Sequence, residues 1–278
     1  MDKPICLITG ATDGIGKVTA AELAGKGYAV VLAARDEAKA ASVTKEIVAS
    51  TGNRDVDYLI ADLRSLAQLR RLAETFTARY PRLDVLINNA GVIMPRRVLT
   101  EDGYETTFQV NYLAQFYLAR LLLDELEKSP QGRVVNLSSS VYRAGKFDPD
   151  NMQGERRFST IAAYAASKLC VLLFTIELAH RLGPTRVTVN AAHPGVVRTP
   201  MMRGAQGVFR AISYAALPFS LSPDKGAVTS VFLASSSDST QVSGQYFAKS
   251  KVKKVKAAAN TRENRDLLWN FSMDACRL

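Results

Sequence analysis

The hydrophobic residues of this chain fall into short continuous runs that alternate with longer stretches in which apolar side chains recur every three or four positions. Short apolar runs bounded by turn signals are typical of buried strands, and we expect strands at residues 5–8, 29–33, 56–60, 85–87, 134–137 and 187–191. The three- to four-residue spacing predicts amphipathic helices at residues 17–26, 37–50, 66–80, 104–128 and 162–182.

This alternation of strand and helix begins at the first residues and implies a parallel sheet with helices on both faces. No linker rich in proline, glycine or serine divides the sequence, so we expect one domain over residues 1–278. The predicted fold class is therefore α/β, a doubly wound sheet in a single domain.

Three segments depart from the alternation. Residues 141–159 are polar and predict an excursion over the surface. Residues 199–221 are apolar, and two interpretations stay open: a substrate lid, or an ordinary core helix. A basic run at 249–256 opens a C-terminal extension, 249–278, and such a run is most often a solvated face.

Composition narrows the class of protein. Of 278 residues, 47% are hydrophobic and 22% charged, which excludes disorder. The three cysteines are far apart and form no C-x-x-C pair, which favours a reducing compartment and a cytoplasmic location. We expect no signal peptide and no membrane-spanning segment. A net charge of +10 fits nucleic acid, an anionic membrane surface or a phosphorylated ligand, and selects none of them.

The first candidate site is a glycine-rich turn between the first strand and the first helix. Glycines at 10, 14 and 16 give the spacing G-x-x-x-G-x-G. Backbone N–H groups at a helix N-terminus bind phosphate, and glycines let the chain turn tightly beside it. Taken alone, this turn predicts a dinucleotide site no better than an unoccupied strand-to-helix connection.

Further polar residues follow the later strands. Asn88 to Gly91 close the fourth strand, and Ser138, Ser139 and Ser140 end the fifth. A doubly wound sheet gathers its ligands at these carboxyl ends. Tyr164 and Lys168 are four residues apart, a spacing that puts both on one face of a helix.

Together, the glycine turn, Asn88 to Gly91, Asn111, Ser139, Tyr164-x-x-x-Lys168 and Pro194-Gly195 resemble the short-chain dehydrogenase/reductase family from residue 4 to about 200. The segments around Ser139, Lys168 and His193-Pro194-Gly195 resemble more narrowly its retinol-dehydrogenase-like branch. The resemblance implies a Rossmann fold and the interconversion of an alcohol with an aldehyde or ketone by hydride transfer with a nicotinamide cofactor.

The resemblance also implies catalytic roles. Tyr164 would exchange a proton with the substrate oxygen, and Lys168 would favour the phenolate and bind the nicotinamide ribose. Ser139 would hydrogen-bond the substrate oxygen, while Ser138 and Ser140 satisfy the backbone. Asn111 would support a water-linked proton path behind Lys168.

The end of the second strand indicates the choice of cofactor. An acidic residue there binds the 2′-hydroxyl of NAD, whereas an arginine accepts the 2′-phosphate of NADP. Ala34 stands where the acid aligns and Arg35 follows, with Lys17 adding positive charge nearby. We therefore expect NADP(H). NAD(H) is the alternative, with Asp36 turned inward to the ribose.

The remaining cofactor-binding candidates follow from the same resemblance. Asp62 and Leu63 match an adenine-contacting pair, although Asp62 also fits a helix N-cap. His193 and His180 have no metal-ligand spacing around them, and we predict structural or surface roles and no metal. The full set of expected cofactor residues is Gly10, Thr12, Asp13, Gly14, Ile15, Gly16, Arg35, Asp62, Leu63, Asn88, Ala90, Gly91, Tyr164, Lys168, Pro194, Gly195, Val197 and Thr199.

The leading hypothesis is an NADP(H)-dependent oxidoreductase acting on a lipophilic small molecule that carries an alcohol or carbonyl group. A dinucleotide-binding regulator or scaffold without catalysis is the alternative. We expect no nucleic-acid partner, because no groove-reading motif is present, and peripheral membrane contact only as an accessory property. The long helices at 107–126 and 162–182 resemble those that the family packs between subunits, which predicts a homodimer or homotetramer.

Overall fold

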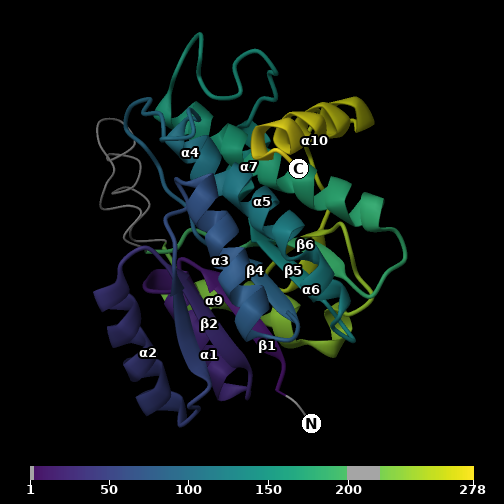
Figure 1. The fold of residues 1–278 in the computed structure, drawn as a ribbon. Helices are drawn as coiled ribbons and strands as arrows, with labels where there is room; N and C mark the ends of the chain where they lie inside the picture. The colour runs from purple at the N-terminus through teal and green to yellow at the C-terminus, as the bar shows by residue number, and fades with distance from the viewer. Residues whose placement is uncertain (1–2, 199–219) are drawn as a thin grey trace.

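The computed structural model describes residues 3–198 and 220–278. Its described strands form one sheet in the order β3-β2-β1-β4-β5-β6-β7-β8 (Figure 1). Neighbouring strands are parallel, except that β8 runs antiparallel to β7. The strands are β1 (Ile5–Thr9), β2 (Ala29–Ala34), β3 (Val56–Ile60), β4 (Val85–Asn88), β5 (Arg133–Leu137), β6 (Thr188–His193), β7 (Tyr246–Ala248) and β8 (Lys251–Lys253).

The helices lie on both faces of the sheet, as the sequence predicts. In chain order they are α1 (Gly14–Gly25), α2 (Glu37–Thr51), α3 (Leu66–Arg79), α4 (Thr106–Phe108), η1 (Gln109–Leu113), α5 (Ala114–Leu121), α6 (Leu123–Glu127), η2 (Ser140–Ala144), α7 (Thr160–Leu182), α9 (Pro223–Ser235), η5 (Ser237–Ser239) and α10 (Arg262–Cys276). The expected doubly wound α/β fold is confirmed. The strands β7 and β8, which the sequence analysis does not predict, have only three residues each.

Alternation along each strand divides the interior into two cores. On β1, Leu7 packs into the core under α3, α5, α7 and α10, whereas Ile8 packs into the core under α1, α2 and α9. Successive side chains of a strand point to opposite faces, so a continuous apolar run is what a sheet covered on both sides requires.

The long helix predicted at residues 104–128 is broken. The stretch begins as α4, widens into the π-helical turn η1, continues as α5 and restarts as α6 after Leu122. Leu122 leaves helical geometry at φ −106° and ψ 11°. Single π-helical turns inside α-helices are rare and are frequent at functional sites.

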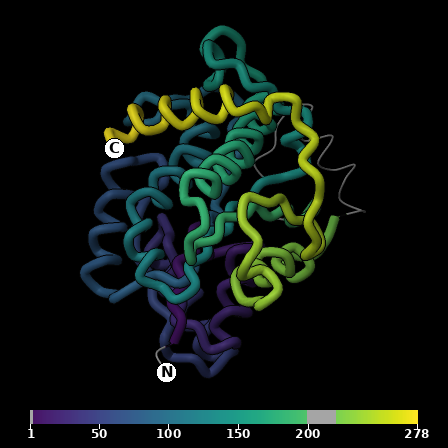
Figure 2. Tube along the Cα trace, turned by 90° about the vertical axis from the view of Figure 1, so that its right-hand side faces the viewer, coloured from purple at the N-terminus to yellow at the C-terminus, as the bar shows by residue number. Residues whose placement is uncertain are grey.

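α7 is long and apolar enough to cross a membrane by length and composition alone. In this fold, 67% of its apolar window is buried inside the protein. The helix packs against β6 and η2, and α10 crosses over it (Figures 1 and 2). Its apolar character is therefore accounted for by its place in the core.

The strand order sets the place of the site. The chain winds outward from β1 through β2 to β3, and then returns to β4 on the other side of β1. Ligands of open α/β sheets bind where the order reverses, beyond the carboxyl ends of the strands. Here that point lies between Thr9 at the end of β1 and Asn88 at the end of β4.

Candidate active site

The glycine turn leaves β1 with a left-handed residue and enters α1 at once. Gly10 has φ +64°, and a side chain there would lie 2.9 Å from the Cα of Ala90. Asp13 caps α1 by accepting a hydrogen bond from the Gly14 N–H at 2.8 Å. Thr12 and Ile15 lie in the same turn and are partly exposed. The glycine turn thus leads directly into the first turn of α1, and the N–H groups at a helix N-terminus are a binding site for phosphate.

Asn89, which the sequence analysis does not single out, braces this turn. Its side-chain nitrogen donates to the carbonyl oxygens of Thr9 at 2.8 Å and Gly10 at 3.1 Å. The backbone N–H groups of Asn89 and Ala90 donate to the hydroxyl of Thr9 at 3.0 and 3.1 Å. The end of β4 and the glycine turn are therefore one hydrogen-bonded unit.

Asn88 points elsewhere than expected. Its side chain is fully buried, and its nitrogen donates to the Asn136 side-chain oxygen on β5 at 2.9 Å. Asn136 in turn donates to the hydroxyl of Thr175 on α7 at 3.0 Å. Asn88 therefore ties two strands and a helix together beneath the site, while Ala90 and Gly91 continue the turn above it.

Tyr164 and Lys168 lie on one face of α7, as their spacing predicts. The Lys168 ammonium is 5.9 Å from the centre of the Tyr164 ring and donates to the carbonyl oxygen of Leu137, at the end of β5, at 2.8 Å. Burial raises the pKa of Tyr164 to about 12, against a lowering contribution from a hydrogen bond with Ser139. Burial lowers the pKa of Lys168 to about 8. At neutral pH the phenol is therefore protonated.

The three serines after β5 have separate partners. Ser139 is the N-cap of η2, where its hydroxyl accepts from the Val141 N–H at 3.4 Å, and it also hydrogen-bonds Tyr164. The hydroxyl of Ser138 donates to the backbone oxygen of Lys168 at 3.0 Å. The backbone N–H of Ser140 donates to His193 at 3.3 Å. Only Ser139 of the three is directed at Tyr164, as the sequence analysis expects.

Asn111 occupies the middle of the π-turn η1. Its oxygen accepts from the Val92 N–H at 2.7 Å, and its nitrogen donates to the Val92 carbonyl at 3.0 Å and to the Ser167 hydroxyl at 3.0 Å. The Ser167 hydroxyl donates to the backbone oxygen of Tyr164 at 2.8 Å. Asn111 is thus linked to α7 through Ser167.

On the rim expected to hold the adenosine half, Lys17 differs from the prediction, and Asp36 does not adopt the inward position of the NAD(H) alternative. Lys17 pairs with Glu46 on α2 at 2.6 Å, so its charge is neutralised there. Asp36 caps α2 and accepts from the Lys39 N–H at 3.0 Å, and it does not turn inward to a ribose. Arg35 is exposed beside it.

Asp62 is held by its neighbour Arg64, with 2.6 Å between carboxylate oxygen and guanidinium nitrogen. Burial raises the pKa of Asp62, but hydrogen bonds and charge from Arg64, with the charge of Arg35, outweigh this and leave it below its usual value. Asp62 is not a helix N-cap, because Ser65 caps α3. Leu63 lies between them, partly buried.

The loop after β6 forms the opposite wall. Gly195, which follows Pro194, has φ +89°, and a side chain there would lie 2.7 Å from Leu221. Val197 forms a parallel bridge with Leu221. The side chains of Val197 and of Ile15 in the glycine turn both lie beside Gly226. Thr199 and most of the expected lid, residues 199–219, lie outside the described residues.

His193 joins the two walls. Its Nδ1 atom accepts from the backbone N–H of Ser140 at 3.3 Å and of Gly195 at 3.4 Å. Burial, and then the charge of Arg143, lower the pKa of this histidine, which keeps the ring neutral and able to accept. The sequence analysis predicts a structural or surface role for His193. The position of His193 directly before Pro194-Gly195 is the sequence feature that indicates its contact with Gly195. His180 is exposed.

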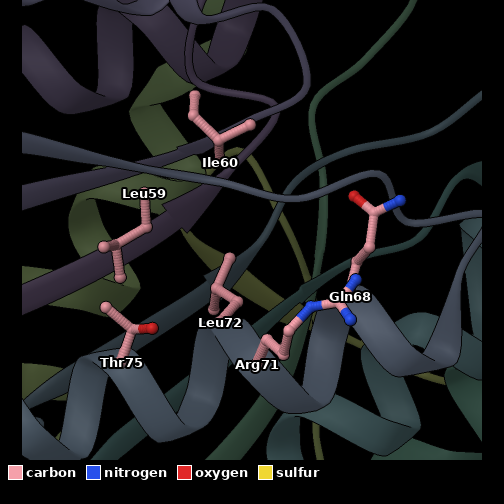
Figure 3. Close-up of a pocket in the computed structure, with 6 residues that line it drawn as sticks. All are labelled: Leu59, Ile60, Gln68, Arg71, Leu72 and Thr75. Atoms are coloured by element: carbon pink, nitrogen blue, oxygen red, sulfur yellow. The ribbon is translucent and has the colours of Figure 1, made fainter.

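Of the hollows in the described surface, the one beside the edge strand β3 measures about 340 Å³ (Figure 3). It is lined by Leu59, Ile60, Gln68, Arg71, Leu72 and Thr75, and it holds none of the expected catalytic residues. The candidate active site is instead the junction of the glycine turn, η2 and α7. Its residues fit a dinucleotide, because Gly10 and Gly16 let the turn pack closely against Asn89 and Ala90 and lead directly into the N-terminus of α1, where phosphate groups bind.

Comparison with known proteins agrees with this geometry. The family model for short chain dehydrogenases matches residues 4–207. Mouse (Mus musculus) retinol dehydrogenase 12 is 42% identical over 273 residues, covering 97% of this chain and 85% of the relative, and human (Homo sapiens) retinol dehydrogenase 13 is 42% identical over 269 residues, covering 95% and 81%.

Two solved structures share the fold. The RhlG/NADP active-site complex of Pseudomonas aeruginosa has a TM-score of 0.71 and 26% identity, and the match covers 87% of this chain and 93% of that one. A variant of actinorhodin polyketide ketoreductase with NADPH has a TM-score of 0.68 and 27% identity, covering 88% and 95%.

Proposed function

We propose that this chain, which belongs to the short chain dehydrogenase family and is an oxidoreductase acting on CH–OH groups, uses NADP(H) to interconvert a lipophilic alcohol and its aldehyde or ketone. The observation that carries the proposal is the meeting of Tyr164, Lys168 and Ser139 beside the glycine turn. A bound nicotinamide cofactor supplies or accepts the hydride in such a reaction.

The chain's own residues handle the proton. We assign Tyr164 as the group that gives a proton to the carbonyl oxygen during reduction, since its raised pKa keeps the phenol protonated at neutral pH. Ser139 holds the substrate oxygen against that phenol. The Lys168 ammonium stabilises the phenolate that remains, because an opposite charge nearby favours the ionised form. Reduction of a carbonyl is the direction for which this protonation state is prepared.

NADP(H) is supported by the residues after β2. Arg35 is exposed beyond the carboxyl end of the strand, where a 2′-phosphate would meet it. Asp36 is engaged as the cap of α2 and so does not compete for a ribose hydroxyl. The structural relatives named above carry NADP or NADPH. NAD(H) is the alternative, and comparison of the Kd values for NADPH and NADH decides between the two cofactors.

A lipophilic substrate is supported by the relatives named retinol dehydrogenase, since retinol is an apolar alcohol. The exposed Val196, on the loop that follows β6, adds apolar surface beside the site. The identity of the substrate stays open within this class.

The test is turnover of NADPH by the purified protein with a series of aldehydes and ketones of increasing hydrophobicity. We expect activity that rises with chain length, and expect Tyr164→Phe to abolish it while NADPH affinity is unchanged. Tyr58→Phe, on the edge strand β3, is the matched control and keeps full activity. Tight NADPH binding without turnover of any carbonyl compound would favour the catalytically silent alternative.

Three further expectations stay predictions. A homodimer or homotetramer is one of them, and α10 of the same chain already packs on Phe116 in one of the helices expected to lie between subunits. A cytoplasmic location is the second. Peripheral contact with an anionic membrane is the third, and the exposed lysines of β8 are the residues that would make it.

A further inference from the structure

Three aromatic residues at four-residue spacing connect the helix of Asn111 to the C-terminal helix. Phe108, Tyr112 and Phe116 come from α4, η1 and α5 respectively, and all are buried. Phe108 meets the Phe271 ring edge-on, with centroids 5.8 Å apart, and Phe116 meets Trp269 in the same way at 5.2 Å. The π-turn that holds Asn111 is thus contacted by α10 on both sides.

Between these ring contacts lies a buried hydrogen bond. The hydroxyls of Tyr112 and Ser272 are 2.6 Å apart, and both side chains have no exposed surface. Ser272 donates its own proton to the backbone oxygen of Leu268 at 2.7 Å, so Tyr112 is the donor in the pair. Loss of this bond would leave the Tyr112 hydroxyl buried without an acceptor, which costs free energy. The folded protein therefore keeps Tyr112 and Ser272 in contact.

α10 itself is held to α7 by charge. The carboxylate of Glu177, 2% exposed, accepts from Arg181 at 2.7 Å and from Arg265 of α10 at 3.1 Å. The guanidinium of Arg181 also lies 4.4 Å from the centre of the Trp269 ring and pairs with Asp266 at 2.9 Å. A buried carboxylate needs its partners, so α10 has little freedom to slide along α7.

We propose that α10 positions Asn111, and that Tyr112 and Ser272 are positioning residues for the reaction. Their hydrogen bond fixes the π-turn, and the π-turn holds the side chain of the adjacent residue Asn111 against Val92 and Ser167. Ser167 passes the constraint to the backbone of Tyr164. The consequence for catalysis rests on the proposed function of Asn111 and Tyr164. The positioning of Asn111 by Tyr112 and Ser272 does not depend on that function.

The experiment compares Tyr112→Phe and Ser272→Ala with Tyr104→Phe. Tyr104 is the matched control, because it also packs on Phe271 and reaches a carbonyl of α10 at 3.5 Å but lies outside the π-turn. Fluorescence of Trp269, the single tryptophan of the chain, reports that α10 stays docked in each variant. Hydrogen exchange of the Val92 N–H reports the position of Asn111 without any assay of activity.

We expect Val92 to exchange about tenfold faster or more in Tyr112→Phe and Ser272→Ala, and at the native rate in Tyr104→Phe. In the same two variants we expect kcat to fall about fivefold while the KM for the cofactor is unchanged. The double variant Asn111→Ala/Tyr112→Phe should have the same kcat as Asn111→Ala alone. Unchanged Val92 exchange overturns the positioning role, whatever the activity. If Val92 exchanges faster in Tyr112→Phe and Ser272→Ala but Asn111→Ala keeps full activity, the positioning of Asn111 by α10 is supported. Asn111 then has no part in the proposed reaction.

Discussion

The side-chain amide of Asn89 donates to the carbonyl oxygen of Gly10 at 3.1 Å, and this contact joins the end of β4 to the phosphate-binding turn after β1. The two residues are 79 positions apart in the sequence. The turn is therefore shaped by a strand that the chain reaches only after three further helices, and its stability depends on contacts at the point where the strand order reverses.

The first prediction concerns Gly16. A side chain at this position would lie 2.3 Å from the Gly10 oxygen and 2.4 Å from the Asn89 side-chain nitrogen. Overpacking of this kind costs roughly 1–3 kcal/mol, so Gly16→Ala should weaken NADPH binding about tenfold or more in a fluorescence titration. Gly25→Ala, near the other end of α1, meets no atom closer than 3.9 Å and should bind normally. Equal affinities would contradict the steric argument.

The second prediction concerns cofactor choice. Arg35→Ala should raise the Kd for NADPH about tenfold or more, since a charge-assisted hydrogen bond to phosphate contributes roughly 1.5–3 kcal/mol. The Kd for NADH should change little, because NADH has no 2′-phosphate. Arg54→Ala removes the same charge from an exposed site before β3 and serves as the control. A parallel loss for both cofactors in Arg35→Ala would assign Arg35 to a role other than phosphate recognition.

The third prediction concerns pH and stability without bound cofactor. Burial lowers the pKa of Lys168 to about 8, whereas an unfolded lysine titrates near 10.4. Between these values the unfolded chain holds a proton that the folded chain has released, so stability rises with pH. The slope from this one group is at most about 1.4 kcal/mol per pH unit.

Urea unfolding of wild type and Lys168→Met at several pH values across this window measures the effect. The difference in unfolding free energy should grow in favour of wild type as pH rises from about 8. Below that pH the difference should be constant, because the lysine is protonated in both states. A constant difference at every pH would mean that burial does not shift the pKa of Lys168.

The fourth prediction concerns His193. Replacement by Leu removes the acceptor of the N–H groups of Ser140 and Gly195, and the net loss of such a hydrogen bond costs roughly 0.5–1.5 kcal/mol. His193→Leu should therefore lose stability by about this amount and lose activity several-fold. His193→Asn supplies an oxygen close to the position of Nδ1 and should recover most of both. Similar behaviour of the two variants would argue that the ring acts by packing against Tyr246 alone.

The local pattern of the sequence predicted much of this protein. Strand and helix periods gave the parallel core of the sheet, and the predicted resemblance to short-chain dehydrogenases/reductases, including the retinol-dehydrogenase-like branch, is confirmed by the family match and the relatives. The four-residue spacing of Tyr164 and Lys168 placed them together because a helix turn is a local property. Ser139 was chosen among three serines through the family resemblance, because all three stand at the same strand end.

Other features depend on contacts between distant segments and only the tertiary structure decided them. Lys17 pairs with Glu46, and Asn88 hydrogen-bonds Asn136. These partners lie far away in the sequence and become neighbours only when the chain folds, so no local pattern predicts them. The same holds for α10: its apolar residues are visible in the sequence, but the buried pair of Tyr112 and Ser272 spans 160 positions. Short-range periodicity thus determined most of the elements up to β6 and the catalytic spacing, whereas partner choice in the folded interior determined which polar side chains are free to act.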